Sequence, residues 1–197
     1  MHLDKQTVKN FHCPRWAELP NLPLYMDQVV LVLKDALGDF ADVGEAVLTP
    51  SMVNNYVKHK MVPPPEKKKY GRKQLAALVV VSMMKRVLSM QEITALIGAM
   101  VADYGIEAAY DLFCQRLEAG LNSAFDASIQ VERGEGALGA LDAALVALCG
   151  KLYLQDYLAG LPQPQPEKGK GKEAKEKKPE KPDKPPLVGA EPQTILR

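Results

Sequence analysis

The sequence predicts an all-α fold, and two observations carry this prediction. Apolar residues recur at spacings of three and four along most of the chain between residues 26 and 158, as on the buried face of a helix. Helix start and stop signals, in the form of N-capping residues, prolines and glycines, fall between these stretches. The chain has 197 residues, of which 47% are hydrophobic, so it is long and apolar enough to bury a core.

The first two predicted helices are separated by a clear start signal. The first covers 26–37 and ends at Gly38, which can serve as its C-cap. The second covers 50–60, because Thr49 is a good N-cap and Pro50 suits the first helical position. Three consecutive prolines follow shortly afterwards and cannot continue a helix.

The third and fourth predicted helices complete a compact unit. The third covers 72–88 and has apolar residues on both faces, which predicts a central position. Ser89 and Glu92 form a capping box that starts the fourth helix, whose apolar residues extend to Met100.

Further helices are predicted after residue 101. The apolar residues over 106–121 form an amphipathic stripe, and a shorter segment with Phe125 and Ile129 follows it. Leucines then repeat at three-four spacing over 138–152, as in a coiled coil. The repeat lasts only about two heptads, so packing within the chain and a dimer interface both remain open.

Charge is distributed unevenly, although the formal net charge of the whole chain is +1. The segment 49–86 holds nine basic residues and one acidic residue, a local balance of +8. The segment 87–158 holds three basic residues and ten acidic ones, a balance of −7. This asymmetry is typical of a chain in which one region faces phosphate and another faces water or a partner.

The helix predicted over 50–60 carries residue types suited to reading DNA. Its apolar residues can pack inward and leave a polar stripe exposed. An asparagine amide can donate to and accept from an adenine edge in the major groove, while serine and lysine reach bases or phosphates. The stripe consists of Ser51, Asn54, Asn55 and Lys58.

A basic loop over 66–72 follows the rigid, proline-rich turn after this helix. Each lysine or arginine that neutralises a phosphate releases counterions, so such a loop adds affinity for DNA of any sequence. The expected contacts are Lys67, Lys68, Lys69, Tyr70 and Arg72.

The segment from Leu48 to Leu96 resembles the winged helix-turn-helix domain of the MerR regulators. In that family a tyrosine-bearing recognition helix leads into a Leu-Leu-Pro-Pro turn, a basic wing, a long helix and a Ser-Leu-x-Glu-Ile helix start. The counterparts are Val-Asn-Asn-Tyr at 53–56, Met-Val-Pro-Pro at 61–64, the lysine loop, and Ser-Met-Gln-Glu-Ile at 89–93. The resemblance implies a DNA-binding transcription regulator.

The sequence resembles more closely an uncharacterised Gram-positive bacterial family, the domain of unknown function number eighteen thirty-six. This resemblance covers roughly residues 15–118 and includes Leu-Pro-Leu-Tyr-Met-Asp-Gln-Val at 22–29 and Pro-Pro-Pro-Glu-Lys-Lys-Lys-Tyr at 63–70. That family implies no activity, so the functional expectation comes from the MerR regulators alone.

The sequence departs from the MerR pattern at several places. The arginine often found before the recognition-helix tyrosine is Asn54, the turn glycine is Lys60, and the wing is shorter. The long dimerisation helix and a recognisable effector pocket are missing. A different base preference is therefore expected.

These features predict four parts and one main function. The parts are an N-terminal extension (1–18), a MerR-like helix-turn-helix domain (19–101), a helical dimerisation or partner region (102–160) and a disordered tail rich in lysine, glutamate and proline (161–197). The expected function is that of a transcription regulator that binds double-stranded DNA. A homodimer is possible, and the small-molecule effector is unknown. The alternative is a protein-interaction module that uses the same basic face to bind an acidic protein.

The sequence predicts no catalytic activity, no bound cofactor or metal, and no membrane span. The three histidines are scattered, and no metalloprotease, nucleophile-elbow or phosphate-loop pattern occurs. The three distant cysteines form neither a disulfide framework nor a metal knuckle, and buried structural thiols are expected at Cys114 and Cys149. The longest apolar run, 75–84, is too short for a membrane span, so a cytoplasmic location is expected.

Overall fold

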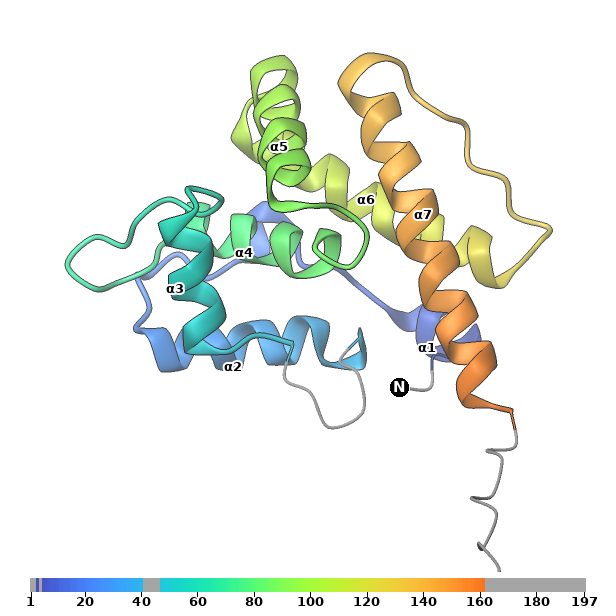
Figure 1. The fold of residues 1–197 in the computed structure, drawn as a ribbon, viewed down its shortest axis with the longest axis horizontal. Helices are drawn as coiled ribbons and strands as arrows, with labels where there is room; N and C mark the ends of the chain where they lie inside the picture. The colour runs from blue at the N-terminus through green and yellow to red at the C-terminus, as the bar shows by residue number, and fades with distance from the viewer. Residues whose placement is uncertain (1–2, 4, 41–46, 162–197) are drawn as a thin grey trace, which may run out of the picture. The chain divides into compact units, whose positions relative to one another are not determined.

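The computed structural model describes residues 3, 5–40 and 47–161. Within this part of the chain the regular structure is helical, which confirms the all-α prediction. Figure 1 labels the helices in chain order. They are α1 (Lys5–Asn10), α2 (Met26–Leu37), α3 (Pro50–Lys58), α4 (Arg72–Met84), α5 (Met90–Tyr104), α6 (Ile106–Phe125) and α7 (Gly136–Ala159), with short 3-10 turns at Trp16–Glu18 and Gly38–Phe40.

Capping residues place the helix starts where the sequence predicts them. The Thr49 hydroxyl oxygen accepts a hydrogen bond of 3.3 Å from the Met52 amide at the start of α3. At the start of α5, the Ser89 amide donates to the Glu92 carboxylate at 2.7 Å, and the Glu92 amide donates to the Ser89 hydroxyl at 3.3 Å. Both side chains thereby satisfy amides that the first helical turn leaves without partners.

The helix ends differ from the predictions where the chain changes direction. α3 ends at Lys58 rather than at residue 60, because Lys60 has a left-handed backbone with φ 59°. α4 ends at Met84 rather than at residue 88, and residues 85–88 form a turn over the end of the helix. The short segment expected around Phe125 and Ile129 is no separate helix: Phe125 closes α6, and the following residues form a connection without helical structure.

α4 occupies the centre of the fold, as its apolar faces predict. It packs against α2 on one side and against α6 and α7 on another, and Figure 1 shows it between α2 and α5. Nine of its 13 residues are buried. α2, which packs against α3, is therefore itself supported by this buried central helix.

One core runs through all the described helices. The described residues up to 161 belong to one compact unit, so the described residues of the predicted parts 1–18, 19–101 and 102–160 share this core. Ile93 and Met100 of α5 belong to it together with Phe113 of α6 and Leu145 of α7. The predicted tail lies, from residue 162 onward, outside the described residues.

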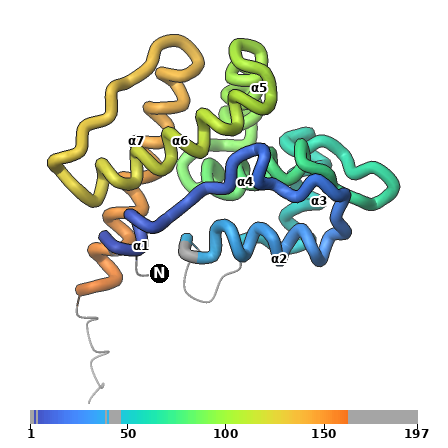
Figure 2. The backbone as a smooth tube through the Cα atoms, turned by 180° about the vertical axis from the view of Figure 1, so that it is seen from behind, coloured from blue at the N-terminus to red at the C-terminus, as the bar shows by residue number. Residues whose placement is uncertain are grey.

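The N-terminal segment is part of the fold rather than an appendage. Leu3, Val8 and Cys13 are buried, and α1 packs against α6. Figure 2 shows this segment running across the molecule from α1 toward α2. Its backbone is tied to α7, since the Leu3 amide donates to the Asp156 carboxylate at 2.6 Å.

α7 is the helix in which the leucine repeat lies. Its buried side includes Leu141, Leu145, Leu148 and Leu152, which pack against α5 and α6. Among the described residues, α7 is also long and apolar enough to cross a membrane by length and composition, although no uninterrupted apolar run in its sequence indicates this. Within the fold, 39% of that apolar stretch is buried.

Candidate nucleic-acid interface

α3 turns two different faces to its surroundings. Val53 and Tyr56 are buried against the rest of the fold, and Met52 and Val57 are partly buried. The opposite face is exposed, and it carries the four residues of the predicted polar stripe, Ser51, Asn54, Asn55 and Lys58. None of the four side chains is needed to hold α3 in place, so all are available to a partner.

The basic loop folds into a tight hairpin whose tip consists of two lysines. Glu66 and Lys69 exchange two backbone hydrogen bonds of 2.9 Å. Between them, Lys67 and Lys68 have φ values of 48° and 65°. Positive φ at both central residues defines the type I′ turn, which joins antiparallel strands with the correct twist. Both lysine side chains are exposed.

The base of this hairpin is held by buried polar contacts. The Gln74 side chain is 8% exposed; its amide nitrogen donates to the Pro64 carbonyl at 3.1 Å, and its oxygen accepts from the Gly71 amide at 3.0 Å. Tyr70 and Leu24 also exchange two backbone hydrogen bonds, of 2.8 and 2.9 Å. The hairpin is therefore clamped between α4 and the segment that precedes α2.

Lysines occupy the left-handed backbone positions of this region. Among the described residues, those other than glycine with positive φ are Lys60, Lys67 and Lys68, and all three are exposed. The left-handed conformation costs a residue with a side chain roughly 1–2 kcal/mol, whereas glycine adopts it freely. Strain of this kind is typical of functional sites. The three positions thus hold positive charge at a cost in stability.

Two of the predicted contact residues, Lys69 and Tyr70, make contacts within the fold. Lys69 is partly buried, with its Nζ 4.9 Å from the centre of the Tyr25 ring. Tyr70 is 3% exposed, and burial raises the pKa of its hydroxyl. The expectation that Tyr70 lies on a binding surface is therefore wrong; in the sequence, its aromatic ring beside the lysines gave no sign that it is a core residue.

Arg72 is also engaged within the fold. Its guanidinium donates to the Leu19 carbonyl at 3.2 Å from Nε and at 3.1 Å from a terminal nitrogen, and it lies 5.9 Å from the Trp16 ring. It attaches the N-terminal segment to α4 and is only partly exposed. These contacts make Arg72 a link between the N-terminal segment and α4 rather than a free cation.

Two exposed lysines outside the predicted site border one cavity. Lys60 lies shortly after α3, and Lys73 lies in the first turn of α4. Both belong to the basic segment 49–86, but only the fold brings them to the same cavity.

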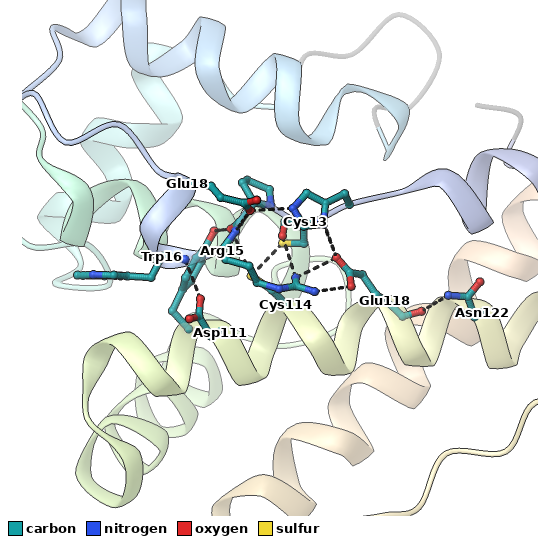
Figure 3. Close-up of polar contacts among 11 residues, drawn as sticks. Cys13, Arg15, Trp16, Glu18, Asp111, Cys114, Glu118 and Asn122 are labelled. Atoms are coloured by element: carbon teal, nitrogen blue, oxygen red, sulfur yellow. Dashed lines mark hydrogen bonds and ion pairs between the residues drawn. The ribbon is translucent and has the colours of Figure 1, made fainter.

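A second polar cluster joins the N-terminal segment to α6 (Figure 3). The Glu118 carboxylate accepts from the Cys13 amide at 2.8 Å and from the Arg15 guanidinium at 2.9 and 2.5 Å. Asp111 accepts from the Trp16 amide at 2.7 Å. We call this set of contacts the N-terminal clasp.

Two thiols lie beside the clasp, with the Cys13 and Cys114 sulfurs 3.1 Å apart. Both cysteines are buried. The hydrogen bond with Cys114 and, next, burial raise the pKa of the Cys13 thiol far above its usual range. A thiol acts as a nucleophile in its ionised form, so this geometry disfavours nucleophilic chemistry at Cys13. In the part of the chain that the structure describes, histidine, cysteine and carboxylate side chains form no group of three that could hold a metal ion.

One comparison with known proteins finds a matching protein family. Residues 14–113 match the family model described as a domain of unknown function, DUF1836. No curated protein and no solved structure matches the chain.

Proposed function

The chain belongs to the DUF1836 family, and we propose that it is a DNA-binding transcription regulator with a MerR-like winged helix-turn-helix. In this proposal α3 enters the major groove, and the hairpin formed by 66–69 acts as the wing on the adjacent phosphates. The bacterial origin and cytoplasmic location expected from the sequence are part of the same proposal.

The observation that carries the proposal is the set of left-handed lysines beside an exposed polar helix face. Lys67 and Lys68 project from a clamped turn in which asparagine and glycine would be less strained. Retaining charge there is reasonable if the charge contacts an anion, and a rigid cationic tip next to a reading helix suits the DNA backbone.

The order of elements supports the same reading. α2 packs against α3, the hairpin follows α3, and α4 supports both α2 and the hairpin. With its apolar side fixed in this way, α3 has Asn54 and Asn55 free to contact base edges. An asparagine amide pairs in two places with adenine, so these residues would specify sequence while the lysines add affinity.

The exposed side of α7 supports a homodimer as part of this proposal. Val146, Leu154, Tyr157 and Leu158 are 72%, 53%, 60% and 50% exposed, although all are apolar or aromatic. Val146 lies eight residues, about two turns, before Leu154, and Tyr157 and Leu158 lie three and four residues after Leu154, so the four share one side of the helix. Burial of this stripe against a second copy would place two α3 helices on one DNA site.

Binding to the DNA upstream of the protein's own gene tests the proposal. Fluorescence anisotropy with this DNA and with a scrambled competitor is expected to show preference for the upstream sequence. Asn54→Ala and Asn55→Ala should reduce that preference, each by about 1–3 kcal/mol at the contacted base. Absence of binding even at low salt would reject the regulator and favour the module that binds an acidic protein.

A further inference from the structure

We propose that the cavity between α4, α5 and α6 binds a small amphiphile with an apolar body and an anionic head. The cavity has a volume of about 230 Å³. Its walls include Val80 of α4, Ile97 and Met100 of α5, and Phe113 of α6. These side chains form a lining without any acidic group, which suits an apolar ligand body.

Two lysines supply the charge of the cavity lining. Lys60 and Lys73 border it, and both are exposed. The other polar side chain in the lining is Tyr110, whose hydroxyl already donates to the Pro14 carbonyl at 2.7 Å. Among the described residues, no carboxylate forms an ion pair with Lys60 or Lys73. The charge of the lining is therefore positive, and the matching ligand head is an anion such as a carboxylate.

The volume indicates the size of the apolar body. A dry protein cavity of about 150 Å³ accommodates benzene, so 230 Å³ corresponds to roughly nine non-hydrogen atoms. A carboxylate with an unbranched chain of about eight carbons fits this volume, with its head between the two lysines. Octanoate is therefore the probe of choice.

The position of the cavity links it to the proposed DNA-binding surface. Lys60 lies two residues after the end of α3, and Met61 and Pro63, which also line the cavity, lead into the hairpin. An anion at Lys60 would neutralise a charge beside the reading helix. We therefore expect octanoate to weaken DNA binding, a consequence that rests on the proposed function, whereas the binding of octanoate itself does not.

Isothermal titration calorimetry of the full chain with octanoate, in the absence of DNA, tests the inference. We expect octanoate to bind, and octan-1-ol, which lacks the charge, to bind at least tenfold more weakly. Lys60→Gln/Lys73→Gln should reduce the affinity for octanoate at least tenfold. Lys67→Gln/Lys68→Gln removes two charges from the hairpin tip outside the cavity and should leave the affinity unchanged.

A variant that fills the cavity provides an independent test. Ala77 is partly buried in the lining, and Ala77→Phe should abolish octanoate binding while both lysines remain. Circular dichroism with thermal unfolding checks that each variant is folded. Octanoate affinity that is equal in the lysine variant and its control, equal binding of octan-1-ol, or binding that persists in a folded Ala77→Phe protein would overturn the inference. Since no DNA is present, none of these results depends on the proposed function.

Discussion

At the scale of single residues, Lys67 and Lys68 are expected to lower the stability of the fold and to raise its affinity for DNA. Both have positive φ in a two-residue turn where Asn-Gly is the favoured pair. Their conformation lowers the stability of the folded state, and their exposed charges are the proposed phosphate contacts.

Replacing Lys67 with asparagine and Lys68 with glycine should therefore change the two properties in opposite directions. The free energy of unfolding is expected to rise by about 1 kcal/mol or more, because the turn loses its strain. The affinity for DNA should fall. Urea denaturation and anisotropy measure the two quantities, and a variant that gains stability while it keeps full affinity would contradict the role given to these lysines.

The cysteine thiols provide a second residue-scale prediction. Burial raises the pKa of Cys149 to about 12, and the hydrogen bond with Cys114 and burial raise the pKa of Cys13, so these two cysteines carry almost no thiolate at neutral pH. Reaction with a thiol reagent at pH 8 should be slow for the native protein and fast in denaturant, where all three cysteines are accessible. Rapid modification of any cysteine in the folded state would be inconsistent with this burial.

At the scale of elements, the N-terminal clasp depends on Glu118. Its carboxylate accepts from the Cys13 backbone and from Arg15, whose side chain is 24% exposed. The hydrogen bond to Glu118 raises the pKa of Arg15, so this arginine stays charged in the pH range in which the protein is studied.

Glu118→Ala should lower the free energy of unfolding by about 2 kcal/mol, because it leaves a partly buried guanidinium and a backbone amide without their acceptor. Chemical denaturation measures the loss. Gln115→Ala, at an exposed position of the same helix, is the matched control and should change stability by less than about 0.5 kcal/mol. A similar loss in both variants would show that the clasp adds nothing to stability.

Local signals decide how far the elements could be predicted. Thr49 and the pair of Ser89 and Glu92 cap their helices through bonds within three residues, so the starts of α3 and α5 are visible in the sequence. The hairpin conformation is not, because two lysines carry no signal for a type I′ turn. The burial of Tyr70 also depends on a distant segment, since its backbone pairs with Leu24.

At the scale of the whole molecule, the features missed by sequence reasoning arise from contacts between distant segments. The clasp joins residues about a hundred positions apart, and the side chains that form it, Arg15, Asp111 and Glu118, are of types common on protein surfaces. The cavity is lined by residues of several helices; one of its lysines, Lys73, lies in α4, and the other, Lys60, lies in the turn after α3. No periodicity within one element indicates either feature.

The proposed dimer is a prediction at this scale. Leu154→Glu/Tyr157→Glu places two charges in the exposed stripe of α7 and should convert a dimer to a monomer, because a charge buried without a partner opposes association. Sedimentation velocity distinguishes the monomer from the dimer in solution. Ala108→Glu, at an exposed position of α6, is the control and should remain dimeric. A monomeric parent protein at micromolar concentration would contradict the assignment of this stripe.

The most direct test of DNA binding is its dependence on salt. Anisotropy titrations of the upstream DNA over a series of salt concentrations give the slope of log K against log salt, which is about −0.9 for each neutralised phosphate. Lys67→Gln/Lys68→Gln should make this slope shallower by about 1.8, whereas Lys5→Gln/Lys9→Gln, on α1, should leave it unchanged. Binding with the same slope in both variants, or no binding at low salt, would contradict the account.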